Sequence, residues 1–266
     1  AYTVLVLRVP ESPRWLVMRK NDEQEALRVL QLSTDDSRAK ELLADIKKDQ
    51  QETAVPHAFF SKKYSFPLML AFLLAMFNQL SGINFILYYA PRILQEAGFG
   101  TSGSLFSSIA IGGTNLIFTI VGMYLIDRAG RKALMYIGSL GYIVSLAMVG
   151  YGFYTGADPM FALTFILLFI ASHAIGQGAV IWVFIAEIFP NRIRANGQAF
   201  GTGTHWVFAA LITLFGVVAI RNFEPHIVFL FFSGFMVFQL LFVAFLMPET
   251  KGVSLEDLQR KLVKED

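Results

Sequence analysis

Six apolar stretches, each long enough to cross a lipid bilayer, constrain this chain more than any other feature. A transmembrane helix needs roughly 20 consecutive apolar residues. Stretches of that length lie at residues 66–95, 104–126, 133–154, 160–186, 195–220 and 226–247. With 55% hydrophobic and 16% charged residues, the composition excludes a soluble domain of 266 residues. We therefore expect an all-α, multi-pass integral membrane protein.

The remaining segments define the expected domain organisation. Residues 1–9 are apolar but have about half the length of a span, so they are interpreted as the end of a truncated transmembrane helix. Residues 10–65 are predicted to form a helical linker, residues 66–247 the six-helix domain, and residues 248–266 a tail. The N-terminus lacks the pattern of a signal peptide. Because the chain has no cysteine, disulfides and thiolate metal sites are excluded.

The linker and the tail are too polar to span a membrane. Ser12 followed by Pro13 predicts a helix start, with Ser12 as the N-cap residue and proline at the first helical position. Amphipathic helices are predicted at 21–32 and 36–53, and another at 254–263 in the tail. A solvated linker without a packed core is the alternative for the first two.

The distribution of basic residues predicts the orientation in the membrane. Only Arg92 and Arg221 of the 22 lysines and arginines lie on the side that holds the 97–103, 155–159 and 221–225 connections. By the positive-inside rule the opposite side, with residues 10–65 and the C-terminus, is cytoplasmic. A net charge of +2 with this distribution needs no nucleic-acid partner to explain it.

The stretch NQLSGINFILYY, residues 78–89, places side-chain amides inside a predicted span. Hydrocarbon offers no hydrogen-bond partner, so Asn78, Gln79 and Asn84 should face other helices or a watery cavity. Ser81 and Gly82 can interrupt the helix at this depth. A group of neutral donors and acceptors suits an uncharged, polyhydroxylated ligand. The alternative is that the amides only join helices.

Other polar or small residues lie within or beside the spans. Asn115 is another neutral amide near mid-depth, which alone would be interpreted as a helix contact, and Gly112 and Gly113 would permit close helix packing. The loop DRAGRK, residues 127–132, joins two spans through a very short connection. Its Asp127 and Arg131 are spaced to clamp a tight turn.

DRAGRK resembles the loop signature of the major facilitator superfamily. PESPRWL (residues 10–16), NQLSGIN (78–84) and PETKG (248–252) are similar to markers of its sugar porter family. The four motifs occur in the order of that family, with matching numbers of spans between them, and the resemblance covers essentially the whole chain. It implies the C-terminal half, with the central cytoplasmic helices, of a twelve-helix transporter whose halves expose a central site alternately to each side.

The resemblance also implies roles for individual residues. Sugar-contacting positions would be Asn78, Gln79, Asn84, Asn115, Trp182, His205 and Trp206, and Tyr88 and Tyr89 would form an outer gate. A cytoplasmic charge network would comprise Glu11, Arg14, Asp127, Arg131, Glu187, Arg194 and Glu249, together with charges from an N-terminal six-helix half. Such a network would hold the inner side closed in the outward-open state.

Three departures from the family pattern concern the substrate path. The prolines usual in the fourth span are replaced by Gln177, Ala179 and Ile181, which leaves the flexibility of that helix open. Ala174 stands where the family often has an amide or carboxylate, and His205 where it commonly has an amide. A neutral imidazole can mimic an amide by donating from one nitrogen and accepting at the other. The alternative for His205 is a bond to a neighbouring helix without sugar contact.

We therefore expect secondary transport of a monosaccharide, a hexose or pentose, across a plasma membrane, by facilitated diffusion or proton symport. No cofactor, metal or covalent chemistry is expected. The chain contains no GxxxxGK[ST] loop for ATP. The alternatives are a non-transporting sugar sensor with the same fold and, more remotely, a membrane enzyme.

Overall fold

The computed structural model describes residues 9–52, 59–253 and 255–263 of the chain. These residues fall into two compact units, with the division between residues 58 and 59. The division lies inside the segment predicted as a linker, 10–65. The truncated span predicted at residues 1–9 lies outside the described residues except for Val9.

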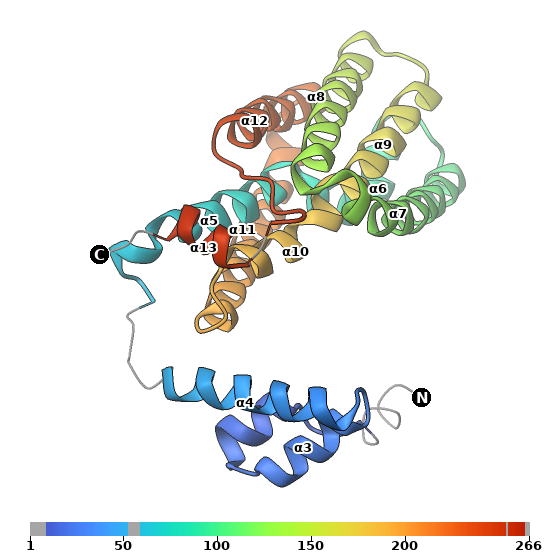
Figure 1. The fold of residues 1–266 in the computed structure, drawn as a ribbon. Helices are drawn as coiled ribbons and strands as arrows, with labels where there is room; N and C mark the ends of the chain where they lie inside the picture. Colours follow the sequence, from blue (N-terminus) through green and yellow to red (C-terminus); the bar gives the residue numbers. More distant parts are fainter. Residues whose placement is uncertain (1–8, 53–58, 254, 264–266) are drawn as a thin grey trace. The chain divides into compact units, whose positions relative to one another are not determined.

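The first unit is a small helical subdomain (Figure 1). It contains α2 (Pro13–Trp15), the π-helix η1 (Leu16–Lys20), α3 (Glu23–Gln31) and α4 (Asp36–Glu52). A core of Leu16, Val17 and Ala26 packs against partly buried side chains of α3 and α4, which argues against an unpacked linker. The first helix begins at Pro13 as predicted, but the Ser12 side chain makes no capping hydrogen bond. Ser12 does occupy the predicted N-cap position, and the α2 turn continues directly into the π-helix η1.

The second unit contains six helical spans long and apolar enough to cross a membrane, which confirms the all-α membrane fold. The 3₁₀ turn η2 (Lys62–Tyr64) leads into the first span. The spans are α5 with α6 (Ser65–Leu80, Ile83–Glu96), α7 (Thr101–Ala129), α8 (Arg131–Thr155), α9–η3–α10 (Pro159–His173, Ala174–Gly178, Ala179–Ile188), α11 (Arg194–Asn222) and α12 (Pro225–Phe245). A short helix, α13 (Leu255–Leu262), follows.

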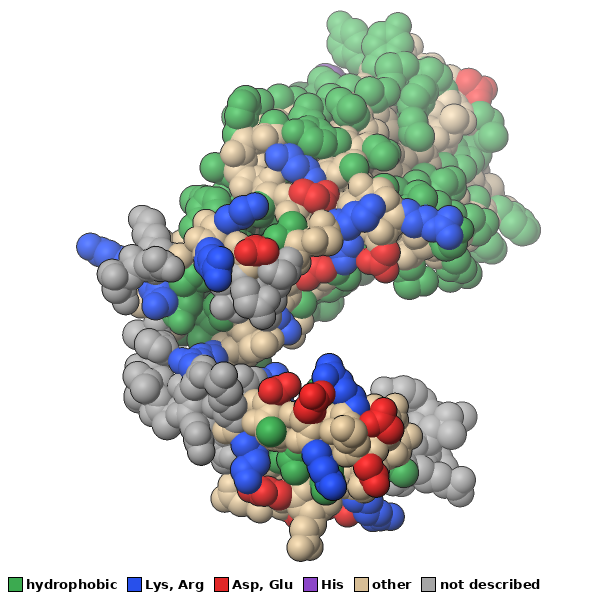
Figure 2. Space-filling view, in the orientation of Figure 1, with side chains coloured by type: hydrophobic (Ala, Val, Ile, Leu, Met, Phe, Trp, Pro, Cys, Tyr) green, Lys and Arg blue, Asp and Glu red, His purple; other side chains and the backbone are tan. Residues whose placement is uncertain are grey.

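The spans pack around one apolar core, in which α8 contacts α9 and α12 while α11 packs on α5. Large aliphatic and aromatic side chains such as Leu70, Tyr142 and Phe184 are fully enclosed there. The spans α7 and α11 are the least enclosed, with 17% and 11% of their most apolar windows buried. Figure 2 shows hydrophobic side chains covering most of the visible surface of this unit, with charged groups gathered along one rim. An apolar surface of this extent is the surface of a protein solvated by lipid or covered by a partner.

A break between α5 and α6 interrupts the first span at the predicted place. Helix α5 ends at Leu80, and Gly82 has a positive φ of 81°. A Cβ at Gly82 would lie 2.7 Å from Phe232 Cδ2, so both backbone conformation and packing require glycine. Ser81 Oγ donates to the Asn78 carbonyl and accepts from the Ile83 N–H, which satisfies backbone groups freed by the break. The amides of residues 78–84 therefore flank a helix discontinuity.

The fourth span retains an irregularity without the family's prolines. Residues 174–178 form the π-helix η3 between α9 and α10. The close approach of α7 occurs here: a Cβ at Gly122 would lie 2.8 Å from the Ala174 carbonyl oxygen. The expectation that Gly112 and Gly113 serve close packing is wrong within this chain, because no atom lies within 4 Å of a Cβ placed at either. Those two glycines lie on the exposed face of α7.

Candidate functional site

A polar cluster at the α5–α6 break joins three amides to a histidine of α11. Gln79 Nε2 donates to Asn78 Oδ1 at 2.9 Å, and Gln79 Oε1 accepts from Asn84 Nδ2 at 3.0 Å. The same Gln79 nitrogen lies 3.2 and 3.3 Å from the two ring nitrogens of His205. The structure thus brings together four of the predicted sugar-site residues, from segments more than a hundred residues apart in the sequence.

Aromatic rings flank this cluster. The His205 ring lies edge-on to Trp182 of α10, with 5.1 Å between centroids, and edge-on to Trp206, with 5.3 Å. Trp182 is 42% exposed and Trp206 58% exposed. Because an indole face suits the C–H surface of a sugar ring, Trp182 beside the amides provides both kinds of contact that a pyranose requires.

The cluster members differ in accessibility. Asn78 and Gln79 are buried, at 3% and 0% exposure, whereas Asn84 and His205 are half-buried. The surface that a ligand can reach in this structure therefore belongs to Asn84, His205 and the flanking Trp182 and Trp206. Gln79 lies behind them and connects two of them by hydrogen bonds.

The other predicted site residues lie apart from the cluster. Asn115 is half-buried on α7, and within the described residues no hydrogen bond links it to Gln79 or Asn84. Of the two predicted gate residues, Tyr88 is 57% exposed. Tyr89 instead donates its hydroxyl to the Thr213 carbonyl at 3.1 Å and packs where Gly216 leaves room on α11. Tyr89 is thus anchored to α11, while Tyr88 is free to contact a ligand or the lipid.

A buried polar chain beside η3 was missed by sequence reasoning. Gln177 Nε2 donates to Gln239 Oε1 at 2.6 Å, and Gln239 Nε2 donates to Ser139 Oγ at 2.8 Å. Nearby, the Tyr142 hydroxyl lies 2.8 Å from His173 Nδ1. The family pattern marks Gln177 only as a replacement for proline, but an amide in an apolar span is itself a signal of a helix–helix hydrogen bond. These hydrogen bonds connect the π-helix η3 to α8 and α12.

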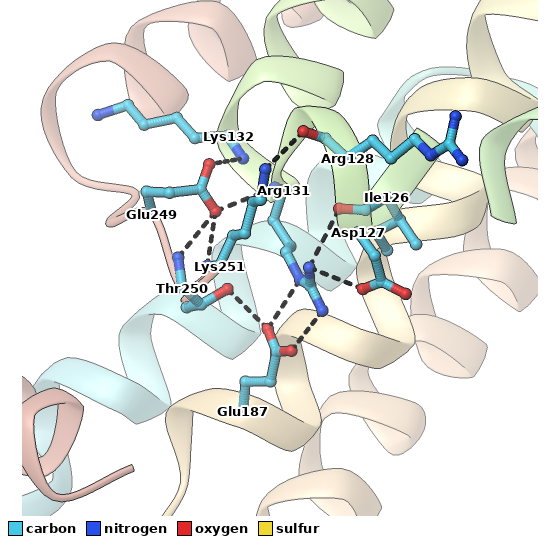
Figure 3. Close-up of polar contacts among 9 residues, drawn as sticks. All are labelled: Ile126, Asp127, Arg128, Arg131, Lys132, Glu187, Glu249, Thr250 and Lys251. Atoms are coloured by element: carbon cyan, nitrogen blue, oxygen red, sulfur yellow. Dashed lines mark hydrogen bonds and ion pairs between the residues drawn. The ribbon is translucent and has the colours of Figure 1, made fainter. Parts of the chain in front are cut away.

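A second polar site joins the ends of α7, α8 and α10 to the segment after α12 (Figure 3). Arg131, only 8% exposed, binds Glu187 through two nitrogens, at 2.7 and 3.1 Å. It also pairs with Asp127 at 3.1 Å and donates to the Ile126 carbonyl. The predicted clamp between Asp127 and Arg131 is present. Thr250 Oγ1 donates to Glu187 at 2.6 Å, so both carboxylate oxygens of Glu187 are engaged.

Glu249 completes this site by capping the start of α8. Its carboxylate accepts the backbone N–H groups of Arg131 and Lys132, each at 3.0 Å, and those of Thr250 and Lys251, each at 2.9 Å. Partial burial raises the pKa of Glu249, but the four backbone donors outweigh burial and hold the pKa below its usual value. The position also benefits from the positive end of the α8 dipole.

Gly130 makes the Glu249 cap possible. Its φ of 92° is unfavourable for other residues, and a Cβ would lie 2.6 Å from Glu249 Oε2.

The remaining members of the predicted charge network lie elsewhere in the structure. Glu11 and Arg14 belong to the first unit, and Arg194 begins α11. Their participation in the network stays a prediction.

Comparison with known proteins places this chain in a family. The family model described as "Sugar (and other) transporter" matches residues 1–262. The chain belongs to the sugar transporter family. The expected resemblance to sugar porters of the major facilitator superfamily is thereby confirmed.

Individual members of the sugar transporter family show the extent of the likeness. The arabinose-proton symporter of Bacillus subtilis is 33% identical over 99% of this chain and 57% of its own length. The facilitated trehalose transporter Tret1 of Bombyx mori is 32% identical over 98% of this chain and 54% of its own length. The structure of the proton:xylose symporter XylE bound to 6-bromo-6-deoxy-D-glucose superposes with a TM-score of 0.83 at 30% identity, over 98% of this chain and 56% of that one. The chain thus spans about half the length of these relatives.

Proposed function

We propose that this chain forms the sugar-binding C-terminal half of a secondary transporter that moves a monosaccharide across the membrane by alternating access. The observation that carries the proposal is the cluster of Gln79, Asn84, His205 and Trp182, which combines neutral hydrogen-bonding groups with an indole at a helix break. Discontinuous transmembrane helices are where transporters of this kind build their substrate sites.

In this proposal the accessible groups contact the sugar and the buried ones support them. Asn84, His205 and Trp182 would bind hydroxyls and the ring face, with Gln79 and Asn78 orienting them from behind. Asn115 and Trp206 would contribute from α7 and α11, and Tyr88 and Tyr89 would close the outer side. The N-terminal six-helix half, which the relatives' greater length supports, would supply the opposite wall.

The basic-residue asymmetry supports a cytoplasmic first unit and C-terminus, and we propose that the protein lies in a plasma membrane. Proton symport and facilitated transport both occur in the names of the relatives, and protons are accordingly proposed as possible co-substrates. These relatives are named as transporters, so the sensor alternative gains no support from them. The Arg131 site is proposed to act on conformation and to leave sugar binding unchanged.

Sugar affinity of variants in the complete transporter tests the binding site. Gln79→Ala removes the link between His205 and Asn84, and losing one buried hydrogen bond should weaken binding about 5- to 150-fold. The matched control is Gln95→Ala, which removes an exposed amide at the outer end of the same span. Binding of D-xylose, L-arabinose and D-glucose would be measured by calorimetry in detergent. Unchanged affinity in correctly folded Gln79→Ala would show that these amides only join helices.

A further inference from the structure

The buried Gln79 amide connects two half-buried polar side chains that belong to different helices. One end, Nε2, faces the ring of His205 on α11, and the other, Oε1, accepts from Asn84 Nδ2 on α6. Gln79 itself is 0% exposed, so no ligand reaches it in this structure. A change at His205 can therefore reach Asn84 through a single rotatable amide.

Hydrogen-bond polarity makes this connection directional. A neutral imidazole offers one acceptor nitrogen, and Gln79 Nε2, which lies 3.2 and 3.3 Å from the two ring nitrogens, can donate to whichever of them carries no hydrogen. The opposite end of the amide is then an acceptor, and Asn84 has to donate to it through Nδ2. The Asn84 carbonyl oxygen remains free to accept a hydrogen bond from a ligand hydroxyl. Gln79 is held in the same orientation by Asn78, whose Oδ1 accepts from Gln79 Nε2.

We propose that His205 is a positioning residue whose acceptor nitrogen sets the orientation of the Gln79 amide and thereby selects which atom Asn84 presents to the sugar. This inference rests on the proposed sugar site. It assigns His205 a role in specificity that acts through Gln79, in addition to any direct contact. With His205 neutral, the site selects a sugar hydroxyl that donates to Asn84 Oδ1.

Protonation of His205 reverses the donor and acceptor roles in the hydrogen bonds that connect His205, Gln79 and Asn84. A charged imidazole donates from both nitrogens and accepts at neither, so Gln79 has to turn Oε1 toward it. Nε2 then faces Asn84, which has to turn as well and present its amide hydrogens to the ligand. The turn also breaks the Gln79–Asn78 bond. A sugar hydroxyl that donated to Asn84 Oδ1, and whose own oxygen already accepts from another group of the site, cannot rotate to accept from Nδ2. That hydroxyl loses its bond to Asn84, and affinity falls as pH falls.

The surroundings of His205 contain one other histidine. His173 lies close enough for electrostatic interaction and is bonded to the Tyr142 hydroxyl. The elements packed against α11 at this level contribute Gln79 from α5 and Trp182 from α10, neither of which titrates. The nearest charged residues of α6, α10 and α11 lie toward helix ends: Arg92, Glu96, Glu187, Arg194 and Arg221.

Sugar binding as a function of pH tests the proposal with two substitutions at position 205. His205→Gln keeps an acceptor that does not titrate, and His205→Leu removes the acceptor. Binding of D-xylose, L-arabinose and D-glucose to the complete transporter in nanodiscs would be measured by calorimetry. His226→Gln, at the N-terminus of α12, is the matched control, because His226 pairs with Glu224 outside the cluster.

At high pH we expect His205→Gln to bind within about threefold of the unchanged protein and His205→Leu to bind about 5- to 150-fold more weakly. As pH falls, the affinity of the unchanged protein should fall relative to that of His205→Gln, whereas His226→Gln should follow the unchanged protein. The ratio to His205→Gln is the readout, because a proton site elsewhere would affect both proteins alike. A ratio that stays constant with pH, or full affinity in His205→Leu, would overturn the proposal.

A measurement without sugar separates this inference from the proposed function. ¹⁵N NMR of the His205 ring reports whether one nitrogen accepts a hydrogen bond. We expect that nitrogen's resonance to move in Gln79→Leu and to stay in Gln95→Leu. Identical ring spectra in the unchanged protein and Gln79→Leu would contradict the positioning role, even if sugar binds. Absence of binding for every sugar, with the expected spectra, would instead contradict the proposed function alone.

Discussion

Single residues at the Arg131 site show how backbone N–H groups bind a carboxylate. Glu249 accepts four N–H groups, two of them from the first turn of α8, where helical N–H groups have no partner within the helix. Gly130 leaves the space for this carboxylate. PETKG and DRAGRK could be recognised in the sequence as separate motifs. Their mutual contact could not, because more than a hundred residues separate them.

The stability contributed by Glu249 should depend on pH. Its pKa in the folded protein is lowered from 4.5, so the charged form is favoured by folding. The contribution is therefore complete above about pH 4.5 and is lost as pH falls through the lowered folded pKa. Thermal unfolding of the unchanged protein and Glu249→Gln in detergent measures it. The Tm of Glu249→Gln should be lower than that of the unchanged protein by a constant amount near neutral pH, and this difference should become smaller in acid.

Glu96→Gln is the control for this comparison, since it removes a carboxylate whose ion pair with Arg92 is largely exposed. Exposed pairs of this kind contribute little to stability, so its Tm should stay close to that of the unchanged protein at neutral pH. A Tm gap for Glu249→Gln that is absent near neutral pH, or unchanged in strong acid, would argue against the backbone cap.

At the scale of elements, local sequence patterns predicted where the spans and the helix break lie, but not which helices contact one another. Apolar length located all six spans, and Ser81–Gly82 located the helix break. The glycines of α7 were misassigned, because sequence alone does not say which face of a helix meets its neighbours: Gly122 does, and Gly112 and Gly113 do not. The Gln177–Gln239–Ser139 chain likewise depends on which helices are adjacent in space. In the four-residue polar cluster, the pattern of amides in an apolar span already indicated Asn78, Gln79 and Asn84 as candidates to bind a polyhydroxylated ligand, whereas His205 could be predicted only through family resemblance.

Arg131 links three elements, and its loss should change conformation more than sugar binding. It joins the end of α7 through Asp127 and the end of α10 through Glu187. If these bonds form in only one state, losing about 1.4 kcal/mol shifts the equilibrium between states about tenfold. We expect Arg131→Ala to slow sugar transport by the complete transporter while sugar affinity from the outside stays within a few-fold.

Arg128→Ala is the matched control for Arg131. Arg128 lies in the same loop motif, but its guanidinium lies over the Tyr124 ring at 3.8 Å instead of binding Glu187. Transport by Arg128→Ala should remain close to that of the unchanged protein. Complete loss of sugar binding in folded Arg131→Ala would place Arg131 in the binding site and contradict a conformational role.

At the scale of the whole molecule, one polar site lies within the membrane spans, the other lies at helix ends, and two of the spans are largely exposed. The polar cluster of Gln79 and His205 lies at a helix break inside the spans, and the Arg131 site lies at the ends of α7, α8 and α10. The least enclosed spans, α7 and α11, carry Asn115 and His205 respectively. A partner half that covers these spans would enclose both residues. Family membership and the shared fold support this arrangement, which composition alone could not specify.

Uptake of radiolabelled sugar into proteoliposomes that contain the complete transporter tests the central claim most directly. D-xylose, L-arabinose and D-glucose would be offered separately, with and without an inward proton gradient, and Asn84→Leu would be compared with Asn222→Leu at the C-terminal end of α11. We predict uptake of at least one monosaccharide by the unchanged protein and by Asn222→Leu, and strongly reduced uptake by Asn84→Leu. Saturable sugar binding without any uptake would contradict transport and favour a sensor.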